Sequence, residues 1–342
     1  MEETIEARQK AIDITPDGHI NKVLCLNNLG NTYEAKFNRL GDPSDLREAI
    51  RAVSTAAQSL IGSPHIKIVA AGQWCRLSGL TNDKQETLRA YGCAISLIPQ
   101  VAWMGLAVEG RHWQLERLSE LVRNAAAAAV KFGEYDTALE WLEQGRSVVW
   151  GQALHLRSPL DALRERDHRI ADRLSAISRA LNADFQDQEL GTSAKRDRLR
   201  TLSFEWDRLV SEVRRMDGFE DFMGPKKFAQ LFQATSSGMV VVLNAHANGC
   251  DALVLRAEAG GVIHIPLSMT TQTTQDLLIS LDNIQSYHPP ARGVEPIDRG
   301  FKVIGGVSYD ANRMIQSLLA ELWAGIVKPV IDGLGLEVDN FI

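Results

Sequence analysis

The residues that most resemble a catalytic centre are His246 and Cys250, which flank an Asn248-Gly249 turn. A cysteine activated by a neighbouring imidazole is the nucleophile of cysteine peptidases. No third group stands near this pair in the sequence to orient the histidine, and Cys250 begins an otherwise apolar run that ends at Leu255. We therefore interpret Cys250 as a packed strand cysteine rather than a nucleophile.

Other motifs that would indicate a cofactor or a metal are missing from the sequence. It contains no GxGxxG, P-loop, HExxH or GxSxG pattern. The late glycine pair Gly305-Gly306 lacks the lysine that a phosphate-binding loop needs, and the nearby aspartates show no ligand spacing. The sequence therefore predicts no cofactor and no metal site.

The composition excludes several classes of protein. The chain has 342 residues, of which 45% are hydrophobic and 23% charged, with a net charge of −6 and no basic stripe. The longest apolar runs, such as Ala125–Val130, are too short to span a bilayer, and residues 1–20 do not form a secretory signal. Four widely spaced cysteines indicate buried thiols in a reducing compartment. These features predict a cytoplasmic protein with no nucleic-acid or membrane partner.

The elements that would carry any site begin with Leu26–Leu60, which reads as two amphipathic helices joined by a turn at Gly41-Asp42-Pro43-Ser44. Ser44 suits the start of the second helix. A lone helical hairpin cannot bury its apolar face, so we expect neighbours of the same shape. The sequence pattern of Ala11–Pro16 recurs at Ala94–Pro99. We expect Pro99 to end the helix that contains it. Small residues at the aligned places, Ala56 and Gly145, would let paired helices approach closely.

These hairpins resemble the tetratricopeptide repeat, although a plain helical bundle is the alternative. The resemblance rests on Leu29-Gly30, Tyr33, Ala49 and Ala56, with a longer interval between Tyr33 and Ala49 than the common form has. It implies a solenoid over residues 1–150 whose first helices line a concave groove. By that pattern, the site residues that would bind a protein or peptide partner are Asn27, Asn31 and Glu34. The alternative is that these side chains only meet solvent.

The sequence pattern of the rest of the chain changes at two points, near residues 151 and 226. Residues 151–225 are expected to form an antiparallel helical hairpin with heptad seams at Ile170, Leu174, Ile177 and Leu181, and at Leu199, Leu202, Trp206, Leu209 and Val213. Residues 226–342 are expected to contain a three-stranded meander over Met239–Leu243, Asp251–Leu255 and Val262–Ile265. Helices are expected over Thr271–Tyr287 and Asn312–Val327, with Pro329 following the second.

This order resembles the fungal proteins that join tetratricopeptide repeats to a CHAT domain, a caspase-like module. The most specific similarities are Leu139–Arg146, Trp150–Gln152 and Cys250–Leu255. The resemblance implies a mainly α chain: a helical-hairpin solenoid, a long helical hairpin, and the N-terminal α/β part of a CHAT domain. In CHAT domains the catalytic histidine belongs to a His-Gly motif, and no histidine here precedes a glycine.

Two functional hypotheses follow. The first is a protein–protein interaction scaffold, the repeat and linker half of a CHAT-type protein, with no catalytic dyad in this chain. The second is a caspase-like cysteine peptidase whose His/Cys dyad lies beyond residue 342, which would make the chain a fragment that ends before the catalytic half.

Overall fold

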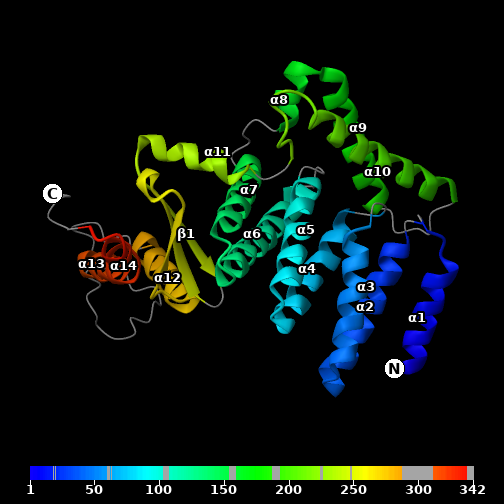
Figure 1. Cartoon of the computed structure of the whole chain (residues 1–342), viewed down its shortest axis with the longest axis horizontal. Coiled ribbons are helices and arrows are strands. Elements are labelled where there is room, and N and C mark those ends of the chain that lie inside the picture. The colour runs from blue at the N-terminus through cyan, green and yellow to red at the C-terminus, as the bar shows by residue number, and fades with distance from the viewer. Residues whose placement is uncertain are drawn as a thin grey trace, which may run out of the picture. The chain divides into compact units, whose positions relative to one another are not determined.

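The computed structural model shows a mainly helical protein with a small three-stranded antiparallel sheet (Figure 1). It describes residues 1–17, 19, 21–59, 62, 64–102, 108–153, 159–186, 193–223, 226–246, 249–286 and 311–336. The chain divides into two compact units, Met1–Ser236 and Ser237–Ile342. We call them the helical unit and the sheet unit. The hairpin expected at 151–225 lies in the same unit as the repeats.

Successive antiparallel helices build the first part of the helical unit, and each packs on the next in the order of the chain (Figure 1). Their apolar stripes meet in a common core that includes Val53, Trp74 and Leu77. The stacked helices are α1 (Glu2–Ile14), α2 (Asn21–Leu40), α3 (Pro43–Ala57), α4 (Pro64–Thr81), α5 (Lys84–Ala102), α6 (Val108–Lys131) and α7 (Tyr135–Ala153).

Small residues allow two of the helical pairs to approach closely. A Cβ atom placed on Gly30 would lie 2.4 Å from Cγ1 of Val53, and one on Gly145 would lie 2.4 Å from Cγ2 of Val122. Because real Cβ atoms do not approach that closely, glycine is required at both places unless the neighbouring valine moves. The expectation of close contact at Gly145 is confirmed.

Two local expectations about helix ends need correction. Helix α3 begins at Pro43 rather than Ser44, because Asp42 is its N-cap and accepts a hydrogen bond from the Ser44 backbone N–H at 2.8 Å. Pro99 does not end α5, which continues to Ala102. Proline removes one helical hydrogen bond, but the buried Val101 holds the last turn against the core.

A second group of helices follows in the same unit: α8 (Pro159–Arg166), α9 (His168–Gln186), α10 (Ser193–Val213) and the short α11 (Phe228–Phe232). Helices α9 and α10 pack against each other, with Leu174 and Ile177 facing a cluster that contains Trp206 and Val213. The predicted helical hairpin is confirmed at these seam positions. The expected contributions of Leu181 and Leu199 lie outside the side chains that the structure describes.

The sheet unit contains β1 (Val240–His246), β2 (Gly249–Leu255) and β3 (Val262–Leu267) in the order β1-β2-β3, all antiparallel. The meander is confirmed, with longer strands than expected. Three helices, α12 (Thr271–Ser286), α13 (Ala311–Leu322) and α14 (Lys328–Gly333), accompany the sheet, and a π-helical segment, Trp323–Val327, joins α13 to α14. Ile265 and Val330 belong to the core between β3 and α14. The helix thus continues through Pro329, which the first turn of α14 accommodates.

One segment of the sheet unit, Arg313–Gly333, is long and apolar enough by length and composition to cross a membrane, with a mean hydropathy of 1.3. Its sequence contains no long continuous apolar run, because charged residues such as Glu321 and Lys328 interrupt it. Only 11% of the most apolar window of this segment is buried, and the half-buried Leu318, Leu322 and Ile326 pack against the core of the sheet unit.

Candidate functional site

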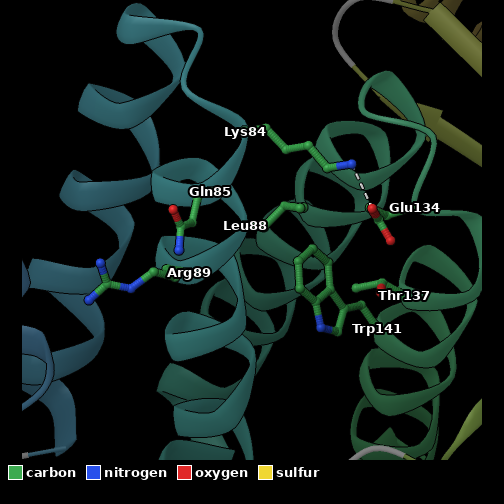
Figure 2. Close-up of a pocket in the computed structure, with 7 residues that line it drawn as sticks. All are labelled: Lys84, Gln85, Leu88, Arg89, Glu134, Thr137 and Trp141. Carbon is green, nitrogen blue, oxygen red and sulfur yellow. Dashed lines mark ion pairs between the residues drawn. The ribbon is translucent and has the colours of Figure 1, made fainter.

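The described part of the helical unit has an open pocket of about 500 Å³ between α5 and α7 (Figure 2). Helix α5 contributes Lys84, Gln85, Leu88 and Arg89, α7 contributes Thr137 and Trp141, and the turn before α7 contributes Glu134. Figure 2 shows Leu88 and Trp141 facing one another across the pocket, with Lys84 reaching over them towards Glu134.

The α5 side of the pocket is held in place at the start of the helix. The Asp83 side chain accepts a hydrogen bond from the Glu86 backbone N–H at 3.1 Å, as an N-cap does. The Glu86 carboxylate in turn accepts a hydrogen bond from Nε1 of the fully buried Trp74 at 2.8 Å. This bond ties the first turn of α5 to α4, so the side chains that line the pocket project from a fixed turn.

The α7 side is set by the turn that precedes the helix. Gly133 has a φ of +76°, its N–H bonds to the Val130 carbonyl, and the Glu134 N–H bonds to the Ala129 carbonyl. This is a Schellman arrangement, which ends α6 and reverses the chain directly before α7. It places the Glu134 carboxylate 2.6 Å from Nζ of Lys84, so an ion pair joins the two sides of the pocket mouth.

The floor of the pocket is apolar and its rim is polar. Trp141 is only 7% exposed and lies 6.4 Å, between ring centroids, from Tyr91, whose pKa burial raises to about 12. Leu88 is half-buried, whereas Lys84, Gln85 and Arg89 are exposed. An apolar side chain could lie between Leu88 and Trp141, while the Gln85 amide offers both a donor and an acceptor to a peptide backbone.

The residues that the sequence predicted for the concave groove occupy different environments. Asn31 on α2 is exposed as expected. Asn27 is only 7% exposed, and its Oδ1 atom is buried without a hydrogen-bond partner. The expectation that Asn27 projects into an open groove is therefore wrong, because it lies on the buried stripe of α2 with Val23 and Gly30.

Glu34 is half-buried and links α2 to α4. Its carboxylate accepts a hydrogen bond from Nε2 of Gln73 at 2.6 Å and forms an ion pair with Arg76. The structure thus adds Gln73 and Arg76 to the polar face that begins at Asn31 and Glu34. Gln73 and Arg76 were not predicted because only the first complete hairpin was considered. Their three-residue spacing on α4 matches that of Asn31 and Glu34 on α2.

The sheet register separates His246 from Cys250. Cys250 is paired with Ala245 and His246 with Gly249, so the two side chains lie on opposite faces. Nε2 of His246 lies 3.1 Å from one oxygen of the Asp251 carboxylate, and Nε2 of His264 lies 2.7 Å from the other. Asp251 therefore links β1, β2 and β3 on the face opposite Cys250. The expectation that no group near this pair could orient His246 is therefore wrong, because Asp251 contacts its imidazole, but a His246–Cys250 dyad is excluded because the two side chains lie on opposite faces.

Burial disfavours the nucleophilic form of three of the four cysteines. Burial raises the pKa of the thiols of Cys75, Cys93 and Cys250, so the reactive thiolate form is disfavoured in each. Burial lowers the pKa of the Lys67 side chain. The nearby Asp207 and Cys93 partly offset this decrease. Within the described ranges, no group of three His, Cys, Asp or Glu side chains has a geometry that could hold a metal ion.

Comparison of the chain with models of protein families, with curated proteins and with solved structures finds no match.

Proposed function

We propose that the helical unit is a protein–protein interaction scaffold of the tetratricopeptide kind, which binds a partner peptide at the pocket between α5 and α7. The observation that carries the proposal is the apolar floor of Leu88 and Trp141 beneath a polar rim, built by two neighbouring helical hairpins. Concave sites with an apolar floor and a few polar groups are typical of ligand recognition.

The lining residues define the chemistry of the partner. A bulky aliphatic or aromatic side chain would fill the space over Leu88 and Trp141. The charged lining residues are Lys84, Arg89 and Glu134, two cations and one anion on a chain whose net charge is −6. An acidic residue beside the apolar anchor would bind Lys84 or Arg89 in exchange for their ion pairs with Glu134 and Glu86, and the Gln85 amide would hold the peptide backbone.

The polar face of α2 and α4 is a second proposed contact surface, formed by the first helices of two hairpins, whereas the pocket lies between the second helices α5 and α7. Asn31 is exposed there, and the bonds from Gln73 and Arg76 hold the Glu34 carboxylate in one orientation. Preorganised polar groups cost less conformational entropy on binding than mobile ones. Asn27 is not part of this proposal, since its side chain is buried. The similarity of the sheet unit to a CHAT domain remains a prediction from the sequence.

Selection from a random peptide library displayed on phage tests the proposal, with the full chain as bait. Enriched peptides are expected to share a bulky apolar residue next to Asp or Glu. Binding of one such fluorescein-labelled peptide, measured by anisotropy, should weaken roughly tenfold or more with Lys84→Glu, which converts attraction to repulsion.

The matched control is Arg51→Glu. Arg51, like Lys84, is an exposed cation in a surface ion pair, here with Glu48 on α3, and it does not line the pocket. Its charge reversal should leave the affinity unchanged. Equal loss of affinity in both variants would indicate non-specific attraction, and unchanged affinity in both would exclude the pocket as the site.

A further inference from the structure

A carboxylate of α7 holds the start of the short helix α11, which packs against α7 in the helical unit (Figure 1). Oε1 of Glu140 accepts a hydrogen bond from the Phe228 backbone N–H at 2.8 Å, although the two residues are 88 positions apart in the sequence. The other oxygen of Glu140 lies 3.6 Å from Nζ of Lys227, the N-cap residue of α11. Glu140 therefore contacts both the N-terminal backbone of α11 and the cation beside it, where a negative charge is stabilising.

The large apolar side chains of α11 lie on one side of the helix. Phe228, Leu231 and Phe232 are spaced at i, i+3 and i+4, and all three are half-buried. Ala229 and Gln230, on the other side, are exposed. This is the pattern of an amphipathic helix that binds in a groove of another protein through a few apolar anchors.

Helix α11 is held less firmly than the stacked helices. No residue of α11 is fully buried, and five residues are too few to form a stable helix in isolation. A hydrogen bond from Nε2 of Gln230 to Oδ2 of Asp221, at 2.7 Å, adds a local restraint. An element with so little buried surface opens at a small cost in free energy, so α11 can detach while the stacked helices stay folded.

We propose that α11 is an internal ligand of a helix-binding surface on the Glu140 side of α7, and that a helix of a partner protein replaces it there. The partner helix that fits carries large apolar residues at i, i+3 and i+4 directly after a lysine or arginine, as α11 does. Because α11 belongs to the same chain, it competes at an effective concentration on the order of 1 mM and keeps the surface autoinhibited. This surface is separate from the pocket, since α7 lines the pocket with Thr137 and Trp141 rather than with Glu140.

Binding of the chain's own helix as a separate peptide tests the proposal. The probe has the sequence of residues 226–233, is stapled between the exposed positions 229 and 233, and carries fluorescein. The host is the full chain with Phe228→Ser and Phe232→Ser, which removes two anchors of the internal ligand. Anisotropy should show saturable binding to this variant and binding at least roughly tenfold weaker to the wild-type chain, because intact α11 competes. The far-ultraviolet circular dichroism should not change, since no residue of α11 is fully buried.

The role of the carboxylate is tested in the same double-serine variant. Adding Glu140→Gln should weaken probe binding roughly tenfold, because it removes the charge that the helix N-terminus and Lys227 contact. The matched control is Glu143→Gln on the same helix, whose carboxylate pairs with Arg146. It should leave the affinity unchanged. Absence of saturable binding to the double-serine variant would overturn the proposal. Equal affinity for the double-serine and wild-type chains, or equal loss in the two glutamine variants, would overturn it as well.

Discussion

At the scale of single residues, the contact between Gly145 and Val122 controls how closely α6 and α7 approach. A methyl group on Gly145 would overlap Cγ2 of Val122, whereas one on Gly72 of α4 would meet nothing within 4 Å. Both glycines lie within helices, so the higher helix propensity of alanine should stabilise each variant by the same amount, about 1 kcal/mol at most. The difference between the two substitutions therefore isolates the packing cost.

We expect Gly145→Ala to lower the free energy of unfolding by about 1–3 kcal/mol, as overpacked cores do, and Gly72→Ala to leave it equal or slightly raised. Urea unfolding followed by circular dichroism measures both. Equal stabilities for the two variants would show that α6 and α7 can move apart without cost.

The buried thiols give a second prediction at this scale. Burial raises the pKa of Cys75 and Cys250, so both should resist modification by a disulfide reagent even when the pH is raised from 7 to 9. In urea all four cysteines should react at once. Rapid reaction of Cys250 in the folded chain at pH 7 would contradict its position as a packed thiol and reopen a chemical role for it.

At the scale of elements, the pairing of α9 with α10 includes a two-point ion pair. Nε and Nη2 of Arg173 lie 2.6 and 2.5 Å from the two oxygens of Glu205. The hydrogen bond from Arg173 lowers the pKa of Glu205 below its ordinary value of 4.5. A carboxylate with a lowered pKa stabilises the folded state above its unfolded pKa, and this contribution is lost as the pH falls through the folded pKa.

Glu205→Gln should therefore destabilise the chain at pH 7 by at most about 1 kcal/mol, because the pair is partly exposed and screened by solvent. The difference from the wild type should shrink as the pH falls below 4.5. Thermal unfolding at pH 7 and at several lower pH values measures it. A difference that grows on acidification would contradict the assigned direction of the pKa shift.

Elements with strong local signals could be predicted from the sequence. The Asn248-Gly249 pattern predicted the β1–β2 pairing, and heptad spacing predicted the seam through Leu174 and Trp206. The end of α5 was misjudged because packing of Val101 outweighs the local effect of Pro99. The burial of Asn27 was missed for a similar reason, since helical spacing alone does not say which neighbours cover a position.

The pocket could not have been predicted in this way. Its two sides come from separate hairpins, and Leu88 and Trp141 meet only because α5 packs near α7. Each side chain alone has an ordinary pattern for a helix in a core. A repeat alignment could have suggested that α5 and α7 are equivalent helices, but not that a space remains between them.

At the scale of the whole molecule, the helical unit should not need the sheet unit in order to fold. Residues 1–236 form a compact unit, and their cores contain no residue of the sheet unit in the described clusters. Stacked helical hairpins depend chiefly on their near neighbours. We expect residues 1–236 expressed alone to be helical, to unfold cooperatively and to bind the selected peptide as tightly as the full chain.

Circular dichroism and peptide anisotropy on this shorter chain measure both properties. Loss of helicity would show that the sheet unit is needed for folding. Retained helicity with lost binding would show that the partner contacts residues beyond Ser236.

Fluorine NMR of Trp141 tests the central claim most directly, because this side chain forms the floor of the pocket. The chain contains seven tryptophans, so labelling with 5-fluorotryptophan should give few enough signals to assign Trp141 by its loss in Trp141→Phe. On addition of a selected peptide, the Trp141 signal should shift more than any other, to an extent that saturates with the affinity measured by anisotropy. A bound peptide that leaves the Trp141 signal unmoved while another tryptophan signal shifts would place the binding site elsewhere.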